Sequence, residues 1–433
     1  PLKSDIRYNQ INHKNGIPIF KIPIKQLNSM KTDVLIIGAG QAGAMTAIAL
    51  RQKKYKGSIT IIGEEEHLPY QRPPLSKNFL AGISHTKNLY LKSSTYYENN
   101  QINILLNNSV ININRTNKNI ELKDGSKFYY KKLVIAVGSK LNILDMHCDK
   151  EDIYYLKTIN DSIKIRSLLD KQKKIVIIGA GYIGLEIAAA ACKKNHKITI
   201  LEADNRVMSR SVCPETSHFF EAIHEKEGVN FFLNTLIKDI HQHDNEKIIT
   251  INNNESINTE AIIIGVGVRP KTKLAVKAGL DCRNGITVNE FCQTSDDNIF
   301  AIGDCANYPN AIYDHRLRLE SVQNAIEQAK IAASMINEID LPHYQIPWFW
   351  SDQYNIKLRI AGVAKGYDNY VVRGSMAEEK FSVFYLKNRR LIALEAINDN
   401  KSFSVGMKLI KNQVSIPEKA LENKESDLRN WLN

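Results

Sequence analysis

Two glycine-rich strings hold the residues whose types and spacing point to chemistry. The string GAGQAG covers residues 38–43, and the string GAGYIG covers residues 179–184. In this pattern the first two glycines let the backbone turn tightly and approach a pyrophosphate, and the third lets a helix pack closely on the preceding strand. A helix that begins there offers free N–H groups and a partial positive charge to phosphates. We therefore expect two dinucleotide sites, with contacts at Gly38, Gly40, Gly43, Gly179, Gly181 and Gly184.

An acidic residue follows each string at the distance expected for a ribose contact. Glu64 and Glu202 come about 20 residues after the first and the second glycine string, each at the end of an apolar run. A carboxylate there accepts hydrogen bonds from ribose hydroxyls and repels a 2′-phosphate, so Glu202 favours NADH over NADPH. Arg206 weakens that expectation only slightly, because it lies beyond the end of the predicted strand.

The elements around both strings are those that such a site needs. Apolar runs at 34–37 and 175–178 predict buried parallel strands, and helices are expected at 42–50 and 183–193. One G-x-G-x-x-G string is weak evidence, whereas two in the same strand, helix and acid context are strong evidence. Two dinucleotide sites on one chain suggest two different dinucleotides with electrons passing between them.

Composition narrows the class of protein. The chain has 433 residues, is 43% hydrophobic and carries a formal net charge of +12, which fits a globular protein of two or three domains. The positive charge indicates a lysine-rich surface or an acidic protein partner, and no nucleic-acid-binding module is present. No apolar run reaches the roughly 20 residues of a membrane span, and no secretory signal is recognised. We therefore expect no membrane insertion and a cytoplasmic location.

The six cysteines argue against two kinds of site. They are scattered, with no C-x-x-C pair and no spacing that suits a metal. Disulfide reductases that bind two dinucleotides keep a C-x-x-C or C-x4-C motif, so electrons are expected to leave the dinucleotide site here directly, without passing through a cysteine pair. Residues 64–82 contain no cysteine, which counts against an NADH oxidase or peroxidase.

Several longer strings together match one family. They are DVLIIGAGQAG at 33–43, LPYQRPPLSKNFLAG at 68–82, KIVIIGAGYIGLEIAA at 174–189, IFAIGDCA at 299–306, LRLESVQNAIEQAK at 317–330 and PWFWSDQY at 347–354. On these strings the chain resembles the NADH-dependent ferredoxin reductases of bacterial oxygenase systems over about residues 32–433. The resemblance implies an FAD enzyme that takes hydride from NADH and passes single electrons to an acidic [2Fe-2S] ferredoxin serving an oxygenase or cytochrome P450.

The resemblance also implies roles for particular residues. Lys77 matches a lysine beside the reactive edge of the flavin, and Glu186 matches the acid that pairs with it; these two are the catalytic candidates. A buried lysine–glutamate pair there can stabilise charge as the ring gains electrons. The other implied cofactor contacts are Ala42 and Glu64 at the ADP half of FAD, Val110 at adenine, Asp304 at the ribityl chain, Val322 at the pyrimidine end, and Arg72 and Lys157.

Each role has a plainer alternative. Lys77 can be an ordinary surface lysine, Glu186 a salt-bridged structural acid and Asp304 a turn residue. Trp348 and Trp350 either close a hydrophobic core or include one ring near the flavin. Two positions depart from the family pattern: Ala136-Val137-Gly138-Ser139 replaces A-T-G-S, and Lys157 stands where an arginine is common, which keeps the charge and loses bidentate geometry.

The predicted architecture is α/β, with two Rossmann-like dinucleotide-binding domains and a smaller C-terminal α+β domain. Residues 31–143 and 270–341 form the FAD-binding domain, 144–269 the NAD-binding domain and 342–433 the C-terminal domain. Residues 1–30 are an extension of unknown role. Alternative functions are an NADH oxidase, an apoptosis-inducing-factor-like NADH-binding flavoprotein and a monodehydroascorbate-type reductase.

Overall fold

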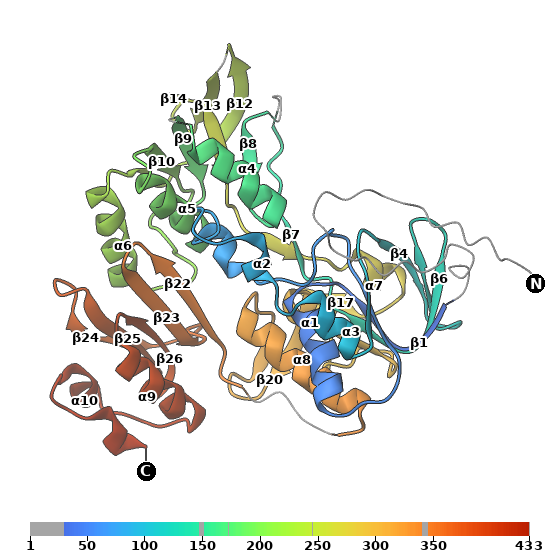
Figure 1. The fold of residues 1–433 in the computed structure, drawn as a ribbon. Helices are drawn as coiled ribbons and strands as arrows, with labels where there is room; N and C mark the ends of the chain where they lie inside the picture. The colour runs from blue at the N-terminus through green and yellow to red at the C-terminus, as the bar shows by residue number, and fades with distance from the viewer. Residues whose placement is uncertain (1–29, 147–150, 172, 245, 340–344, 433) are drawn as a thin grey trace, which may run out of the picture. The chain divides into compact units, whose positions relative to one another are not determined.

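The computed structural model describes most of the chain beyond residue 29 (Figure 1). The described residues are 30–146, 151–171, 173–244, 246–339 and 345–432. The extension predicted at residues 1–30 lies outside them except for Met30, and so does Cys148. The described chain forms two compact units. The first holds residues up to 71, 90–140 and 270–345, and the second holds residues 72–89, 141–269 and 346–433.

The first unit is built on a seven-stranded sheet whose central strands are parallel. The order is β3-β2-β1-β6-β5-β4, and β19 also pairs with β6. β5 pairs antiparallel with the first half of β6, while β19 pairs parallel with its second half. The strands are β1 (Met30–Ile37), β2 (Ile59–Ile62), β3 (Ile102–Leu105), β4 (Val110–Asn114), β5 (Asn119–Leu122), β6 (Lys127–Ile135) and β19 (Ile299–Ala301).

Two long helices pack side by side against this sheet (Figure 1). They are α1 (Gln41–Gln52) and α8 (Val322–Ile336), and their alanine-rich faces join Val34 and Ile36 in one buried core. The remaining elements of the unit are short. They are α3 (Ser94–Asn99), α7 (Lys273–Lys277), η3 (Gly303–Cys305) and the strands β17 (Cys282–Arg283), β18 (Gly285–Thr287), β20 (Ala306–Asn310) and β21 (His315–Leu317).

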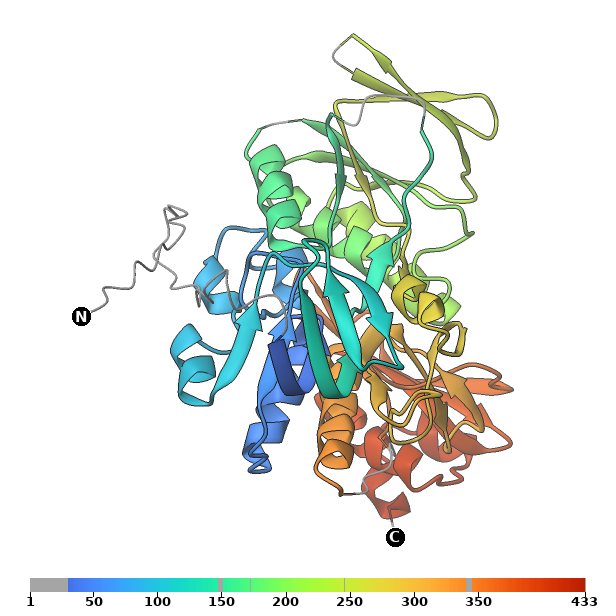
Figure 2. The same cartoon turned by 90° about the vertical axis from the view of Figure 1, so that its right-hand side faces the viewer.

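The central part of the second unit is a five-stranded parallel sheet in the order β11-β10-β9-β15-β8. A separate three-stranded antiparallel sheet, β12-β13-β14, packs against it (Figure 2). The strands are β8 (Ile153–Tyr155), β9 (Lys174–Ile178), β10 (Lys197–Leu201), β11 (Asn230–Phe232), β12 (Ile237–His243), β13 (Glu246–Ile251), β14 (Ser256–Thr259) and β15 (Ala261–Ile264). The helices are η2 (Pro73–Ser76), α2 (Thr86–Leu89), α4 (Ile159–Leu169), α5 (Tyr182–Cys192) and α6 (Pro214–Lys226).

The C-terminal part of the second unit is a five-stranded antiparallel sheet in the order β22-β23-β26-β25-β24. Helix α9 (Asn400–Lys411) packs on this sheet and is capped by Asp399, whose side chain accepts from the Ser402 N–H. The other elements are β22 (Trp348–Gln353), β23 (Ile356–Gly362), β24 (Asn369–Ser375), β25 (Lys380–Lys387), β26 (Arg390–Ile397), α10 (Glu418–Glu422) and η4 (Leu428–Trp431). The chain passes between the units after residues 71, 89, 140, 269 and 345. Two of these points lie within β7 (Ser139–Leu141) and β16 (Val268–Pro270).

The predicted fold class is confirmed: the structure has two sheets with parallel central strands, each with a glycine turn after one of those strands, and a smaller α+β part at the C-terminus. The helices predicted at 42–50 and 183–193 are α1 and α5, each shifted by one or two residues. Because the two compact units group the C-terminal residues with the central segment, the three-domain division stays a prediction.

Candidate functional site

In the first glycine turn, two glycines are required by the fold itself. Gly38 has a φ of +118°, and a Cβ there would lie 2.2 Å from the Ala136 carbonyl oxygen. A Cβ on Gly43 would lie 1.9 Å from the Gly38 carbonyl oxygen, so only glycine lets α1 pack this closely. At Gly40, by contrast, a Cβ would meet no protein atom within 4 Å. The space beside Gly40 is open, as a bound pyrophosphate needs.

The second glycine turn shows the same difference between its first and third glycines and its second. Gly179 has a φ of +100°, and its Cβ would lie 2.7 Å from the Gly265 carbonyl oxygen. A Cβ on Gly184 would lie 2.1 Å from the Gly179 carbonyl oxygen, while Gly181 has open space around it. In both turns the second glycine is the helix N-cap and supplies no side-chain hydrogen bond. The first N–H groups of both helices are thus left without a side-chain cap, as phosphate binding requires.

The two acids predicted to bind ribose are held differently. The Glu64 carboxylate is an exposed group, 2.8 Å from the Lys271 ammonium. The Glu202 carboxylate turns back onto its own turn, where Oε2 accepts from the Ala180 N–H at 2.6 Å and Oε1 accepts from the Asp204 N–H at 3.0 Å. Arg206 donates to the carbonyl oxygens of Ser209 and Val212. Its guanidinium is therefore committed to its own loop, in keeping with the preference predicted for NADH.

Asp304 lies next to the first glycine turn. It is in η3, directly after β19, and Gly303 brings this turn so close that a Cβ on Gly303 would lie 3.2 Å from the Ala42 Cβ. The Asp304 carboxylate accepts a hydrogen bond of 2.7 Å from the Ser139 hydroxyl. Strand β19 and the start of α1 therefore place Ala42 and Asp304 at one edge of the sheet, where ligands of such folds bind.

Lys77 and Glu186 form an ion pair inside the second unit. Lys77 Nζ lies 2.7 Å from Glu186 Oε2, and the Glu186 side chain is only 4% exposed. Glu186 comes from the first turns of α5, and Lys77 follows η2. Ser76 donates to the same carboxylate oxygen, and Ser351 donates to Oε1 at 2.6 Å. The burial and pairing of Lys77 thus exclude an ordinary surface lysine. A salt-bridged structural acid agrees with the geometry of Glu186, and the role of the pair at a flavin stays a prediction.

The remaining candidates are placed as follows. The Arg72 guanidinium donates to the Lys157 carbonyl oxygen at 2.5 Å, so these two lie together in the second unit. Val110 begins β4 beside an irregularity in its pairing with β5. Val322 begins α8, whose N-cap Ser321 accepts from the Asn324 N–H. Trp348 and Trp350 contact one another on β22, with ring centroids 5.5 Å apart. That these residues bind a cofactor or lie near one stays a prediction.

Both glycine turns lie in a part of the chain that matches a known protein family. The family described as pyridine nucleotide-disulphide oxidoreductase matches residues 32–329, and the family described as reductase C-terminal matches residues 348–432. The chain belongs to the pyridine nucleotide-disulphide oxidoreductase family. Members of this family use FAD and NAD(H), and the open second glycines and uncapped helix starts fit both groups.

Individual members of the oxidoreductase family resemble the chain along nearly its whole length. It is 36% identical to rhodocoxin reductase of Rhodococcus erythropolis, over 92% of this chain and 93% of that one. It is also 36% identical to putidaredoxin reductase CamA of Pseudomonas putida, over 92% and 96% of the two chains. Putidaredoxin reductase in its covalent complex with putidaredoxin gives a TM-score of 0.89 at 35% identity, covering 93% and 98% of the two chains. The resemblance inferred from sequence is therefore confirmed.

Three of the described cysteines of this oxidoreductase are buried thiols with raised pKa values. Cys192, Cys213, Cys282, Cys292 and Cys305 are all free thiols. Burial raises the pKa of Cys305 and of Cys213 to about 12 and raises that of Cys292 further, so little reactive thiolate forms at neutral pH. Over the part of the chain that the structure describes, no group of three His, Cys, Asp or Glu side chains could hold a metal ion.

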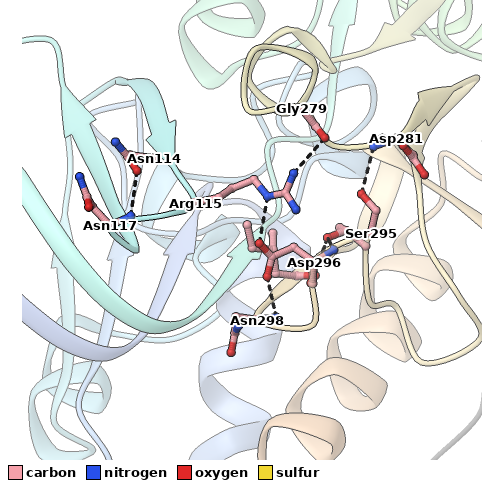
Figure 3. Close-up of polar contacts among 10 residues, drawn as sticks. Asn114, Arg115, Asn117, Gly279, Asp281, Ser295, Asp296 and Asn298 are labelled. Atoms are coloured by element: carbon pink, nitrogen blue, oxygen red, sulfur yellow. Dashed lines mark hydrogen bonds and ion pairs between the residues drawn. The ribbon is translucent and has the colours of Figure 1, made fainter.

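A surface pocket of the first unit is lined by none of the predicted site residues. It has a volume of about 540 Å³ and is lined mainly by residues 112–116, 277–278 and Asp296. Arg115 crosses one side of it, donating to Asp296 at 2.9 Å and to the Gly279 carbonyl oxygen at 3.0 Å (Figure 3). The guanidinium thus fastens the end of β4 to the segment after α7, which is a structural task.

Four contributors to these sites were missed by sequence reasoning. Lys271 and Ser139 hold Glu64 and Asp304, and Ser76 and Ser351 hold Glu186. The three serines lay inside strings already recognised, AVGS, LPYQRPPLSKNFLAG and PWFWSDQY, and that was the available signal. Lys271 had no such signal, since lysine is abundant in this chain.

In the described residues, no helix combines the length and the apolar character that a membrane span requires.

Proposed function

We propose that this chain is a cytoplasmic NADH-dependent ferredoxin reductase, which serves an oxygenase or cytochrome P450. The observation that carries the proposal is the pair of glycine turns, each with an open second glycine and an uncapped helix start. When bound, FAD supplies the ability to accept a hydride from a nicotinamide and to release electrons one at a time. The first turn, with Glu64 and Asp304, holds FAD, and the second turn, with Glu202, holds NADH.

In this proposal the Lys77–Glu186 pair lies at the reactive edge of the flavin. The Glu186 carboxylate keeps the Lys77 ammonium in one place, and a positive charge fixed there favours the negative charge that hydride adds. The chain needs no nucleophile or proton-abstracting base for this step. Its own contribution is to position both dinucleotides and to hold that charge.

An acidic iron–sulfur protein is the electron acceptor that the charge favours. The net charge of +12 attracts an acidic partner and raises the rate of encounter. One solved relative is putidaredoxin reductase joined to putidaredoxin, which supports a partner of this kind. The raised pKa values of the buried thiols argue against a route through cysteine, and reduced thiols fit the cytoplasm.

Anaerobic titration with NADH, followed by electron transfer to an added [2Fe-2S] ferredoxin, tests the proposal. The purified protein is expected to be yellow and to bleach with NADH; bleaching by NADPH but not NADH contradicts the coenzyme. Cytochrome c reduction should depend on the ferredoxin and should fall between low and high salt, because screening weakens the encounter. Equal rates without ferredoxin, with oxygen consumed instead, would favour the NADH oxidase.

A further inference from the structure

A run of buried polar side chains leads away from Glu186 inside the second unit. Ser351 Oγ donates to Glu186 Oε1 at 2.6 Å, and the Gln353 side-chain amide donates to Ser351 Oγ at 3.2 Å. Both residues are on β22, and both are essentially fully buried, at 0% and 1% exposed. Buried polar groups at this depth are costly unless every one is hydrogen-bonded.

The run continues into helix α6 and on to Tyr354, whose hydroxyl also interacts with the Cys192 thiol. His224 Nε2 lies 2.8 Å from the Gln353 side-chain oxygen, and the Tyr354 hydroxyl lies 3.1 Å from His224 Nδ1. Burial lowers the pKa of His224 to about 4, so its ring is neutral at pH 7 and has a single N–H. Because the Gln353 oxygen can only accept, that proton is on Nε2, and Nδ1 accepts from Tyr354.

These assignments give every hydrogen bond the same direction. Tyr354 donates to His224, His224 to Gln353, Gln353 to Ser351 and Ser351 to Glu186. We call these four residues, Tyr354, His224, Gln353 and Ser351, the donor chain. It ends on the oxygen of Glu186 that Lys77 does not contact. Hydrogen bonds aligned head to tail in a low-dielectric interior polarise one another, and the strongest is the one to the carboxylate.

We propose that the donor chain fixes the Glu186 carboxylate so that its other oxygen holds the Lys77 ammonium, with Ser351 as a positioning residue for that pair. The C-terminal sheet thereby supplies part of what holds the Lys77–Glu186 pair in place. This inference rests on the proposed function, because it takes Lys77 to face the flavin. Ser351 touches neither cofactor nor substrate in this account and acts only through Glu186.

The midpoint potential of bound FAD in Ser351→Ala tests the inference. Without the hydroxyl, Glu186 holds the lysine less firmly, and the equilibrium constant for reducing the flavin should fall about fivefold. That corresponds to a potential about 20 mV more negative, at about 30 mV per factor of ten for a two-electron couple. Ser351→Thr keeps a hydroxyl and should restore the wild-type potential. An unchanged potential in Ser351→Ala overturns the proposal.

Ser382→Ala is the matched control. Ser382 is also fully buried in the same C-terminal sheet and also donates to a carboxylate, that of Asp399 at 3.0 Å. Its loss should leave the potential unchanged. Equal shifts in Ser351→Ala and Ser382→Ala would show a general effect of weakening the sheet and would overturn the positioning role. If Ser351→Ala does not fold, Gln353→Met removes the donor to Ser351 while leaving its hydroxyl, and a smaller shift in the same direction is expected.

Two further readouts do not depend on the flavin. In a double-mutant cycle measured by chemical unfolding of the FAD-free protein, Ser351→Ala should be less damaging in the Glu186→Gln background than in wild type. Nitrogen NMR of His224 should show a neutral ring protonated at Nε2, and a proton on Nδ1 overturns the donor direction. If NADH fails to bleach the wild type, the proposed function is lost, whereas these two measurements still decide whether the donor chain exists.

Discussion

The two glycine turns have nearly the same sequence, yet the acids predicted to bind ribose, Glu64 and Glu202, are held in opposite ways. In the first unit Glu64 projects from its strand and meets the side chain of Lys271. In the second unit Glu202 folds onto the backbone N–H groups of Ala180 and Asp204. The close contacts at the first and third glycines are alike in both turns. Close backbone contacts therefore determine the conformation of both turns. The neighbours of each acid determine how firmly its carboxylate is held in position for the predicted ribose contact.

Gly43→Ala and Gly184→Ala should have the largest effects, and the effects should be equal. Their new Cβ atoms would lie 1.9 and 2.1 Å from backbone oxygens, which cannot move without opening the helix–strand packing. We expect each to destabilise its unit by at least about 3 kcal/mol. Urea unfolding followed by circular dichroism measures this. If either variant folds with wild-type stability, the two turns do not obey the same steric rule.

Glu395→Gln should reveal a pH-dependent stability in the second unit. Glu395 is fully buried, and its carboxyl group accepts from the Cys213 N–H, just before α6, at 3.1 Å. Burial raises the pKa of Glu395 from 4.5 to about 7. The folded protein thus keeps a proton that the unfolded chain releases, and stability contributed by this group falls as pH rises from about 4.5 to about 7.

The glutamine variant lacks this ionisation, so it should gain up to about 3 kcal/mol relative to wild type at pH 8 and little at pH 4.5. Thermal unfolding of both proteins at the two pH values measures the gain. His224 titrates in the opposite sense, because its lowered pKa means that stability is lost as pH falls from 6.5 to about 4. That contribution is present in both proteins and cancels in their difference. A gain independent of pH would show that Glu395 stays ionised when folded.

Gly40→Ala and Gly181→Ala should separate the two cofactors without damaging the fold. Neither new methyl group meets a protein atom within 4 Å, but each would enter the space beside a pyrophosphate. Gly40→Ala should weaken FAD, and Gly181→Ala should weaken NADH, each by at least about 30-fold or roughly 2 kcal/mol. Flavin content and NADH titration measure the split. Loss of FAD in Gly181→Ala would mean that the sites are assigned wrongly.

Glu202→Ala should weaken NADH by about tenfold and leave bound FAD unchanged. The carboxylate loses its ribose contact and also its hold on the Ala180 N–H, and hydrogen bonds to charged groups contribute about 1.5–3 kcal/mol. Glu64→Ala is the reciprocal variant, in which FAD should be weakened and NADH spared. Equal losses of both dinucleotides in either variant contradict the assignment.

The turns could be predicted from sequence because their requirements are local. Each turn needs a glycine with positive φ, a second glycine with open space beside it and an acid after the next strand. These residues form a pattern within about 30 positions of the sequence. The ion pair between Lys77 and Glu186 joins positions far apart in the chain, and only the family resemblance indicated it. The donor chain depends on how η2, α5, α6 and β22 pack together. No pattern in a single segment encodes that packing.

Lys271→Ala should have the smallest effect, and it tests why the two acids differ. The pair with Glu64 is half exposed, so it contributes at most about 1 kcal/mol and is weakened by salt. We expect FAD to bind about twofold more weakly to the variant at low salt, since Glu64 is no longer held in place. At high salt the wild type and the variant should bind FAD alike. NADH affinity should show no such convergence, because Glu202 is held by backbone groups. Tighter FAD binding in Lys271→Ala would instead mean that the lysine competes with the ribose for Glu64.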